Sequence, residues 1–294
     1  MKRDKFEQFW KALSHYDLSK PLSATAITYL TSQLSKVFGG EVAKQSKLWA
    51  RKAATDLTAA YRRYQKDGYK KYSKNLVGWR LKELKEKFRR ELKKRIKLNA
   101  DLIAPYKSDL KKLVEKRFVG AMSGGKMSVK DLKSMLKLSA TLKSQDKKVS
   151  NTLKDQKMKM ISEFGRLTAE KYKAIGFEWS TRDDDLVVGN PGGHYPKVSN
   201  PQIHGNHYER DGKVFLFKDS WAVERGYINK AYAGDEDGFK WAEDIEDGYP
   251  GMPINCRCEA LYIYTIEELA NDYYLGKCLT PNGKKYLERR EAGI

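Results

Sequence analysis

The chain has 294 residues, and its 58 lysines and arginines against 38 aspartates and glutamates give a formal net charge of +20. Because no run of about 18 apolar residues is present, the sequence predicts no membrane span. The basic residues at the start are not followed by an apolar stretch, which argues against a secretory signal. We therefore expect a protein made and used in the cytoplasm, with enough residues for two domains.

The charge is distributed unevenly along the chain. Residues 1–180 hold 44 Lys and Arg against 18 Asp and Glu, a net charge of +26, whereas residues 181–294 hold 14 against 20, a net charge of −6. Cationic side chains that displace condensed counterions bind DNA without contacting any base. Such an excess favours sequence-independent binding of double-stranded DNA by the first part, over the alternative that lysines merely solvate long helices.

Residues 1–176 have the pattern of helices, because Gly and Pro are sparse and apolar residues recur every three or four positions, as between Leu81 and Ile96. We expect breaks at Gly39-Gly40, between Asn99 and Pro105, and at residues 123–125.

A helix start is predicted at Ser128, whose hydroxyl can cap the helix while the acidic Asp131 reaches back to the free amides. A last long helix is predicted from about Asp146 to Ile175, with Gly176 ending it at the position after the C-cap.

The basic residues assigned to DNA contact lie in the helical region. They are Arg62, Arg63, Lys70, Lys71, Arg80, Arg89, Arg90, Lys93, Lys94 and Arg95. Aromatic residues interleave the cations over residues 61–80. These rings can stack on the bases of single-stranded nucleic acid, but aromatic side chains at helical spacing more often pack against other helices.

After Gly176 the pattern changes to short clusters of β-forming residues, at 177–181, 213–217 and 259–264, separated by loops rich in Gly, Asn, Pro and Asp. Residues 265–268 form a capping box that starts a short helix. Cys278, in the tail, is interpreted as a small hydrophobe or a free thiol.

The expected fold class is α+β. A long basic helical region facing DNA or a partner, residues 1–176, precedes a loop-rich module with a short antiparallel sheet, residues 177–264, and a C-terminal helix and tail, residues 265–294.

Scarce residue types gather in this module. Two of the three cysteines and three of the four histidines lie between Trp179 and Cys258. They fall in three motifs, Trp-Ser-Thr-Arg-Asp-Asp-Asp at 179–185, His-Tyr-Glu-Arg-Asp-Gly-Lys-Val-Phe at 207–215, and Pro-Gly-Met-Pro-Ile-Asn-Cys-Arg-Cys at 250–258.

The order and spacing of these motifs resemble the phage head-morphogenesis family, the minor head proteins of tailed bacteriophages similar to protein F of phage Mu. The resemblance covers about residues 177–262, with Leu186-Val-Val188 where the family has Val-Arg. It implies a non-enzymatic minor capsid protein inside the virion, at the portal vertex, acting in head assembly and in DNA packaging or delivery. The implied partners are the portal protein, the major capsid protein and genomic DNA. The residues that carry the structural signature are Trp179, Asp183, Asp184, Gly212, Pro250, Gly251, Asn255 and Arg257.

Thiolate and imidazole are the ligands that zinc prefers. His207, Cys256 and Cys258 are therefore candidate ligands of a structural Zn²⁺, with His204, His194 or an aspartate as the fourth. Cys256 and Cys258 are too close in sequence for an easy disulfide, so a reduced compartment or a metal fits better. The alternative is two small buried cysteines beside a histidine that hydrogen-bonds a loop.

Three enzymatic interpretations also remain. His207 with Glu209 and the two cysteines resembles, loosely, the arrangement of zinc deaminases. His204 and His207 are similar to nuclease histidines that activate water, which makes a metal-dependent DNA-processing enzyme the main alternative function. A cysteine nucleophile needs Cys256 or Cys258 beside His207.

Acidic runs at residues 183–185, 235–237 and 243–247 do not have the spacing of a calcium loop. We interpret them as solvated loops or docking faces for basic partners, except that one of Asp183 to Asp185 is expected to hold the loop that carries His207.

Overall fold

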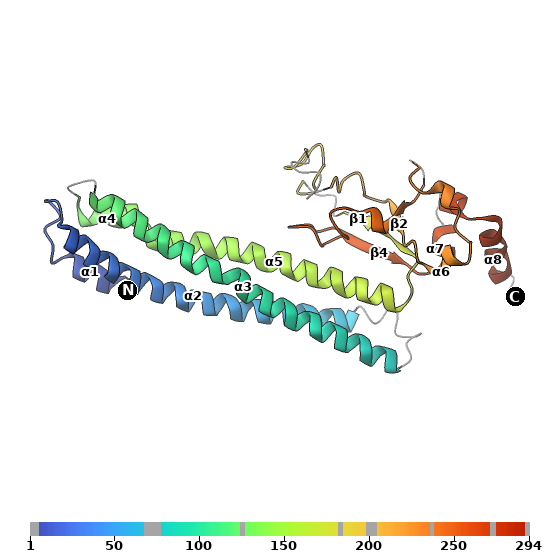
Figure 1. Cartoon of the computed structure of the whole chain (residues 1–294), viewed down its shortest axis with the longest axis horizontal. Helices are drawn as coiled ribbons and strands as arrows, with labels where there is room; N and C mark the ends of the chain where they lie inside the picture. Colours follow the sequence, from blue (N-terminus) through green and yellow to red (C-terminus); the bar gives the residue numbers. More distant parts are fainter. Residues whose placement is uncertain are drawn as a thin grey trace. The chain divides into compact units, whose positions relative to one another are not determined.

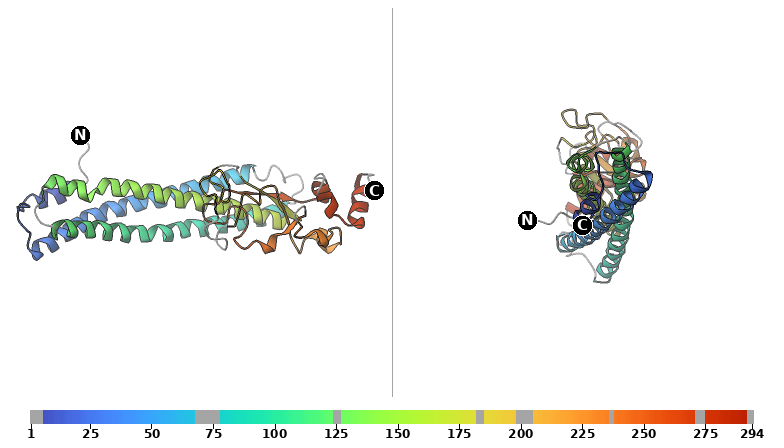
Figure 2. Two further views of the ribbon diagram at one scale, coloured as in Figure 1. Left: turned by 90° about the horizontal axis from the view of Figure 1, so that it is seen from above. Right: turned by 90° about the vertical axis from the view of Figure 1, so that its left-hand side faces the viewer.

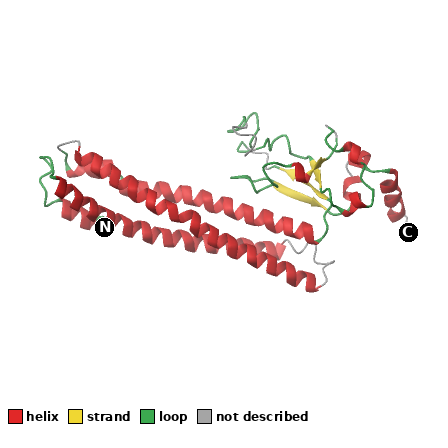
Figure 3. Cartoon of the chain, viewed as in Figure 1, coloured by secondary structure: helices red, strands yellow, loops and turns green. Residues whose placement is uncertain are grey.

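The computed structural model describes residues 6–67, 78–123, 127–181, 185–197, 205–235, 238–270 and 275–291. Long helices are followed by a small four-stranded mixed sheet, which confirms the α+β class (Figures 1 and 3). The helices are α1 (Glu7–Leu13), α2 (Ala24–Asp67), α3 (Gly78–Ser123), α4 (Val129–Leu136), α5 (Leu138–Lys171), α6 (Trp221–Glu224), α7 (Ile266–Ala270) and α8 (Pro281–Glu291). The strands are β1 (Gly176–Ser180), β2 (Val214–Leu216), β3 (Lys240–Trp241) and β4 (Glu259–Ile263).

The chain forms two compact units. The first comprises Met1–Ala59 with Lys93–Lys154, and the second comprises Ala60–Leu92 with Asp155–Ile294. The boundaries between the units therefore fall within α2 and α3 and near the middle of α5. The second unit holds the sheet and all three motifs.

In the first unit, segments of α2, α3 and α5 run side by side, with α1 and α4 at one end (Figures 1 and 2). Leu30, Leu34 and Phe38 on α2 are fully buried at a spacing of four, which places them on one face of the helix. On α3, Phe118 is equally buried and packs its ring edge-on against Phe9, with the centroids 5.7 Å apart. Apolar residues that recur every three or four positions therefore form the core of a helical bundle in this unit. From the stripe predicted between Leu81 and Ile96, Leu84 and Phe88 are instead buried in the second unit.

The predicted break at Gly39-Gly40 is wrong, because α2 continues through both glycines. Phe38 and Val42 on either side belong to the same core, and a Cβ at either glycine would meet nothing within 4 Å. Burial of the flanking side chains offsets the roughly 1 kcal/mol that a glycine costs in a helix interior.

The predicted break between Asn99 and Pro105 is also wrong, since α3 runs from Gly78 to Ser123 with Pro105 inside it. Proline removes one backbone hydrogen bond, but Ile103 and Leu110 on either side are buried in the core and hold the helix together. α3 is described as far as Ser123, and the rest of the predicted break at 123–125 lies outside the described residues.

The Ser128 cap is confirmed. Its hydroxyl accepts a hydrogen bond from the backbone N–H of Asp131 and donates one of 2.5 Å to the Asp131 carboxylate. The last long helix differs from the prediction, because α5 starts eight residues earlier and ends at Lys171.

Gly176 is not the residue after the C-cap of α5, as predicted, but the first residue of β1. A Cβ at this position would lie 2.3 Å from the backbone oxygen of Phe215, so only glycine lets the neighbouring strand approach. The helix instead ends near Lys173, whose φ of +55° is in the left-handed region.

The strand order in the sheet is β3-β2-β1-β4. β1 pairs antiparallel with β2, with Phe177 opposite Phe215, and antiparallel with β4, with Phe177 opposite Tyr262. These are the three predicted strands, and their antiparallel pairing is as expected. The two-residue β3 was not predicted, and it pairs parallel to β2, which makes the sheet mixed.

The two faces of the sheet carry different clusters, because successive side chains of a strand point to opposite faces. Val214 and Leu216 of β2 join a core with Cys278, which is buried as a small hydrophobe and is not in a disulfide. Phe215 joins the opposite cluster, which includes Phe177, Trp179, Cys256 and Cys258. The candidate metal ligands therefore lie on one face of the sheet.

After β4, Glu268 accepts hydrogen bonds from the backbone N–H groups of Tyr264 and Thr265, which confirms the predicted capping box before α7. Among the residues that the structure describes, no helix is both long and apolar enough to cross a bilayer.

Candidate metal centre

His207, Cys256 and Cys258 form one buried cluster that can hold a metal ion. His207 lies in the loop before β2, and the two cysteines lie in the loop before β4. All three side chains are at most 6 % exposed. Their candidate ligand atoms all lie within 4.8 Å of one another, so the fold brings together residues up to 51 positions apart.

The distances within the cluster suit a tetrahedral ion. Nδ1 of His207 lies 3.6 Å from Sγ of Cys256 and 3.7 Å from Sγ of Cys258. In a tetrahedral zinc site with ordinary Zn–N and Zn–S bond lengths, the coordinating nitrogen and a coordinating sulfur lie about 3.6 Å apart. The residues present therefore fit a zinc ion without moving the histidine.

The second ring nitrogen of His207 is held by a carboxylate. Nε2 lies 3.1 Å from Oδ2 of Asp247, which also accepts a 2.7 Å hydrogen bond from the backbone N–H of Gly205. Oδ1 of the same carboxylate accepts a 2.6 Å bond from Arg210. A metal-binding histidine commonly donates its other N–H to a carboxylate in this way, which fixes the ring and raises its basicity.

The electrostatics of this group follow from burial and charge. Burial lowers the pKa of His207, but its hydrogen bonds with Asp247 and Cys256 outweigh this and raise the pKa to about 9. Burial raises the pKa of Asp247, and the hydrogen bonds from His207, Arg210 and Gly205 outweigh it and hold the pKa well below its usual range. The carboxylate is therefore ionised.

The two thiols influence each other. A hydrogen bond from Cys258 lowers the pKa of Cys256 to about 5, despite burial, and the neighbouring His207 adds to the effect. The same hydrogen bond, with Cys258 as donor, raises the pKa of Cys258, burial adds to the rise, and the negative charge on Cys256 adds further because a second thiolate beside the first is unfavourable. In the absence of a cation, one thiolate and one thiol form the pair.

Trp179 and Arg210 cover the cluster. The Trp179 ring is fully buried, with its centroid 5.2 Å from that of His207, and the Arg210 guanidinium lies 4.8 Å above the indole. Gly212 adopts a φ of +68° and donates its N–H to the Trp179 oxygen, which returns the chain toward β2. The first two motifs therefore meet at the cluster.

The third motif is a loop anchored on α5. The Pro250 oxygen accepts a hydrogen bond from the Ser162 hydroxyl, and the Asn255 N–H donates a 2.7 Å bond to Asp155. Asn255 has a φ of +58°, a conformation that asparagine tolerates better than most residues. These bonds fix both ends of the segment that leads into Cys256.

Gly251 lies at a position where the backbone conformation and the neighbouring helix favour glycine. Its φ is +80°, and an added Cβ would lie 3.1 Å from Cβ of Ser162. Its N–H donates to Sγ of Cys256 at 3.3 Å. Arg257, between the cysteines, is only partly exposed.

The fourth predicted ligand is not among the three clustered residues. His204 lies outside the described residues, as do Asp183 and Asp184. His194 lies away from the cluster with its side chain 66 % exposed, 3.8 Å from Asp185. The aspartate that holds the His207 loop is Asp247, from a run that we interpreted as solvated or docking.

That interpretation is wrong for Asp247, whose side chain is only 1 % exposed. Within the same run, Asp244 is 58 % exposed and pairs with Lys218, as expected for a surface acid. No local sequence pattern separates Asp247 from the exposed acids of its run, because its partner His207 lies 40 positions away.

Most of the residues assigned to DNA contact are exposed on α2 and α3: Arg62, Arg63, Arg89, Arg90, Lys93 and Lys94. Arg95 differs, since it is 7 % exposed and offers little surface to a phosphate. Lys70 and Lys71 and the side chain of Arg80 lie outside the described part.

The described aromatic residues near these cations pack within the second unit. Tyr64 contacts Phe88 and Phe164 at centroid distances of 5.4 and 5.3 Å, and Tyr61 contacts Phe164 at 6.0 Å. Tyr61 and Tyr64 therefore serve as core residues, in line with the packing alternative.

The cluster also has the arrangement that a cysteine nucleophile needs, with a histidine beside the thiols as a base and an aspartate that orients the histidine. However, Cys256 is 6 % exposed and Cys258 is 5 % exposed. Glu209, which the deaminase comparison requires, is exposed and lies outside the cluster. Burial of the sulfurs favours a metal ligand or a packed thiol over a group that must reach a substrate.

No protein-family model, no curated protein and no solved structure matches this chain. The resemblance in the three motifs therefore stays a prediction.

Proposed function

We propose that this protein is a non-enzymatic structural protein in which a zinc ion, held by His207, Cys256 and Cys258, ties together two loops of the sheet module. The observation that carries the proposal is the burial of all three ligands beside the Asp247 carboxylate. Zinc supplies a cross-link between the loops that contain residues 205–213 and 250–258, and because the unfolded chain lacks the assembled site, the free energy of metal binding stabilises the folded state. Neutralisation of the thiolates by the cation removes the repulsion between them.

We further propose that the protein is a minor head protein of a tailed bacteriophage, inside the capsid at the portal vertex. Support comes from the three motifs of the resemblance, which meet around one cluster: Trp179 covers His207, and the Pro250 loop supplies both cysteines. In this role the module contacts the portal protein or the capsid wall. The exposed arginines and lysines of α2 and α3 contact packaged DNA without reading its sequence.

Two measurements on the full chain test this proposal. Mass spectrometry of purified phage particles from a host that encodes the chain should find it in few copies relative to the major capsid protein. Binding to duplexes of unrelated sequence should be equal and should weaken steeply as salt rises. Absence from particles would overturn the virion role.

The rival function, a metal-dependent DNA-processing enzyme, gives a different result. A divalent-cation-dependent cleavage of DNA that His207→Ala abolishes without unfolding the chain would replace the structural role with a catalytic one.

A further inference from the structure

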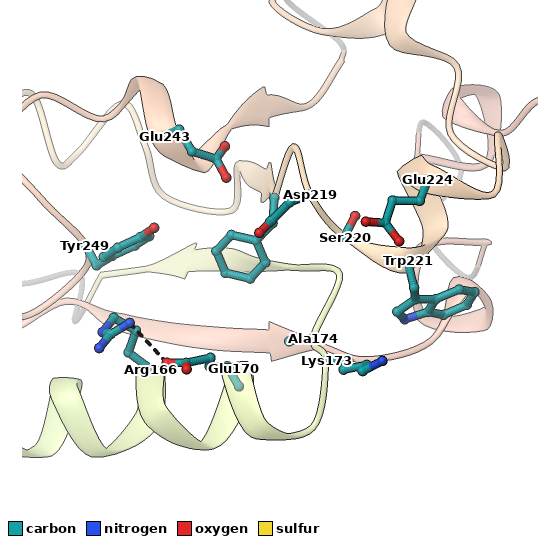
Figure 4. Close-up of a pocket in the computed structure, with 12 residues that line it drawn as sticks. Arg166, Glu170, Lys173, Ala174, Asp219, Ser220, Trp221, Glu224, Glu243 and Tyr249 are labelled. Carbon is teal, nitrogen blue, oxygen red and sulfur yellow. Dashed lines mark hydrogen bonds and ion pairs between the residues drawn. The ribbon is translucent and has the colours of Figure 1, made fainter. Parts of the chain in front are cut away.

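A pocket of about 390 Å³ lies in the second unit. It is bordered by the end of α5, the segment from Phe217 to Glu224, and the loop residues Glu243 and Tyr249 (Figure 4). This volume is within the range of small-ligand sites. The candidate metal ligands do not contribute to its lining.

The lining is acidic. Four carboxylates, from Glu170, Asp219, Glu224 and Glu243, face two cations, Arg166 and Lys173. Arg166 is already engaged by Glu163, with hydrogen bonds of 2.9 and 3.0 Å, and it pairs with Glu170 of the lining at 3.4 Å. Asp219, Glu224 and Glu243 then face only Lys173. A net negative charge is left for a bound group.

Two of these carboxylates are available to a ligand. Among the residues that the structure describes, neither Asp219 nor Glu224 has a hydrogen-bond or ion-pair partner. Both are exposed side chains at the pocket. Glu243 accepts two hydrogen bonds from the backbone N–H of Lys218, which fixes its carboxylate in place. Burial raises the pKa of Tyr249, and Glu243 adds to the rise, so the phenol stays protonated.

Ser220 gives an independent sign of a ligand. It is 6 % exposed, and its hydroxyl is buried without a hydrogen-bond partner. It lies at the pocket between the two free carboxylates, as Figure 4 shows. Although it precedes α6, its hydroxyl does not cap that helix. A buried polar group without a partner is costly, and a ligand that donates a hydrogen bond removes the cost.

Aromatic rings complete the lining, from Phe217, Trp221 and Tyr249. A cation over an aromatic face is attracted by the ring electrons. Guanidinium is planar, stacks on rings and carries five N–H donors, so it matches several carboxylate and hydroxyl acceptors better than the compact ammonium does.

We propose that this pocket binds a guanidinium group, with Asp219, Glu224 and the Ser220 hydroxyl as acceptors beside the aromatic lining. The group is either the arginine side chain of a protein or a free small guanidinium compound. The site is independent of the zinc ion and of DNA binding.

Calorimetric titration of the full chain with N-acetyl-arginine amide tests this proposal. Binding is expected, whereas the neutral N-acetyl-citrulline amide, of nearly the same shape, should not bind. The double variant Asp219→Asn/Glu224→Gln should weaken binding about tenfold or more, because charge-assisted hydrogen bonds are lost. A control with the same loss of charge, Glu288→Gln/Glu291→Gln on α8, should bind as the wild type does.

Ser220→Ala separates a ligand role from a structural one. It should weaken binding several-fold without lowering the melting temperature, because the hydroxyl has no partner to lose. Agmatine and a five-residue peptide with a central arginine identify the source: tighter binding of the peptide supports a protein side chain, and tighter binding of agmatine supports a small cation. Equal binding of the citrulline analogue, or no effect of the double variant, would overturn the site.

Discussion

Replacement of Asp247 by asparagine tests whether the buried carboxylate stabilises the candidate metal centre. The wild-type carboxylate is 1 % exposed and accepts three hydrogen bonds, from Arg210 at 2.6 Å, from the Gly205 N–H at 2.7 Å and from His207 at 3.1 Å. Asparagine keeps the shape, loses the charge and turns one acceptor into a donor. Arg210 is then left without its counter-ion.

Breaking a buried ion pair from one side costs about 3–5 kcal/mol. The second compact unit has about 170 residues, for which each kcal/mol lowers the melting temperature by about 2–4 °C. Asp247→Asn should therefore lower the melting temperature of this unit by about 6–20 °C. Loss of the support of His207 should also weaken metal binding by about 10–100-fold.

Thermal unfolding followed by tryptophan fluorescence measures the melting temperature, and urea unfolding measures the free energy of unfolding, each with and without a chelator. Asp244→Asn is the matched control, because its carboxylate is 58 % exposed and its ion pair with Lys218 lies at the surface. The control should change stability by less than about 1 kcal/mol. If Asp247→Asn changed the free energy of unfolding as little as the control does, the hydrogen bonds of Asp247 would not stabilise the site.

Two further predictions concern the third motif and the helical region. Gly251→Ala should destabilise the second unit by about 1–3 kcal/mol in urea unfolding, because alanine is strained at a φ of +80°. Gly39→Ala, in the open helix interior of α2, should instead be neutral or stabilising by up to about 1 kcal/mol, and the reverse order would contradict the account. Arg89→Gln/Arg90→Gln should reduce the salt slope of DNA binding by about 2, as measured by fluorescence anisotropy. A matched loss of the two lysines at 284–285 should leave the slope unchanged, and an equal effect of both pairs would mean that net charge alone governs binding.

The sequence predicted the parts of the fold that depend on local pattern. Helical periodicity identified the core face of α2 and α3, and the Ser128 cap depends on residues three apart. The breaks at the paired glycines and at Pro105 were wrong because burial on both sides outweighs the local cost. β3 has only two residues and leaves no periodicity to detect.

For the candidate site, the useful signal in the sequence was that cysteine and histidine are rare in this chain and gather in one region. The rare cysteines and histidines identified His207, Cys256 and Cys258 as candidate ligands, and the structure brings them together. The role of Asp247 could not be predicted, because the sequence of an acidic loop does not distinguish a buried carboxylate from a solvated one. Its role depends on a contact across 40 positions, which no local pattern encodes.

Inductively coupled plasma mass spectrometry of the purified full chain measures whether the cluster of His207, Cys256 and Cys258 holds zinc. We expect one zinc per chain in the wild type and in Cys278→Ser, whose thiol lies in the other core. Cys256→Ser/Cys258→Ser should contain none and should melt at a lower temperature. A wild-type protein without metal, or a double variant that keeps its zinc, would contradict the central claim.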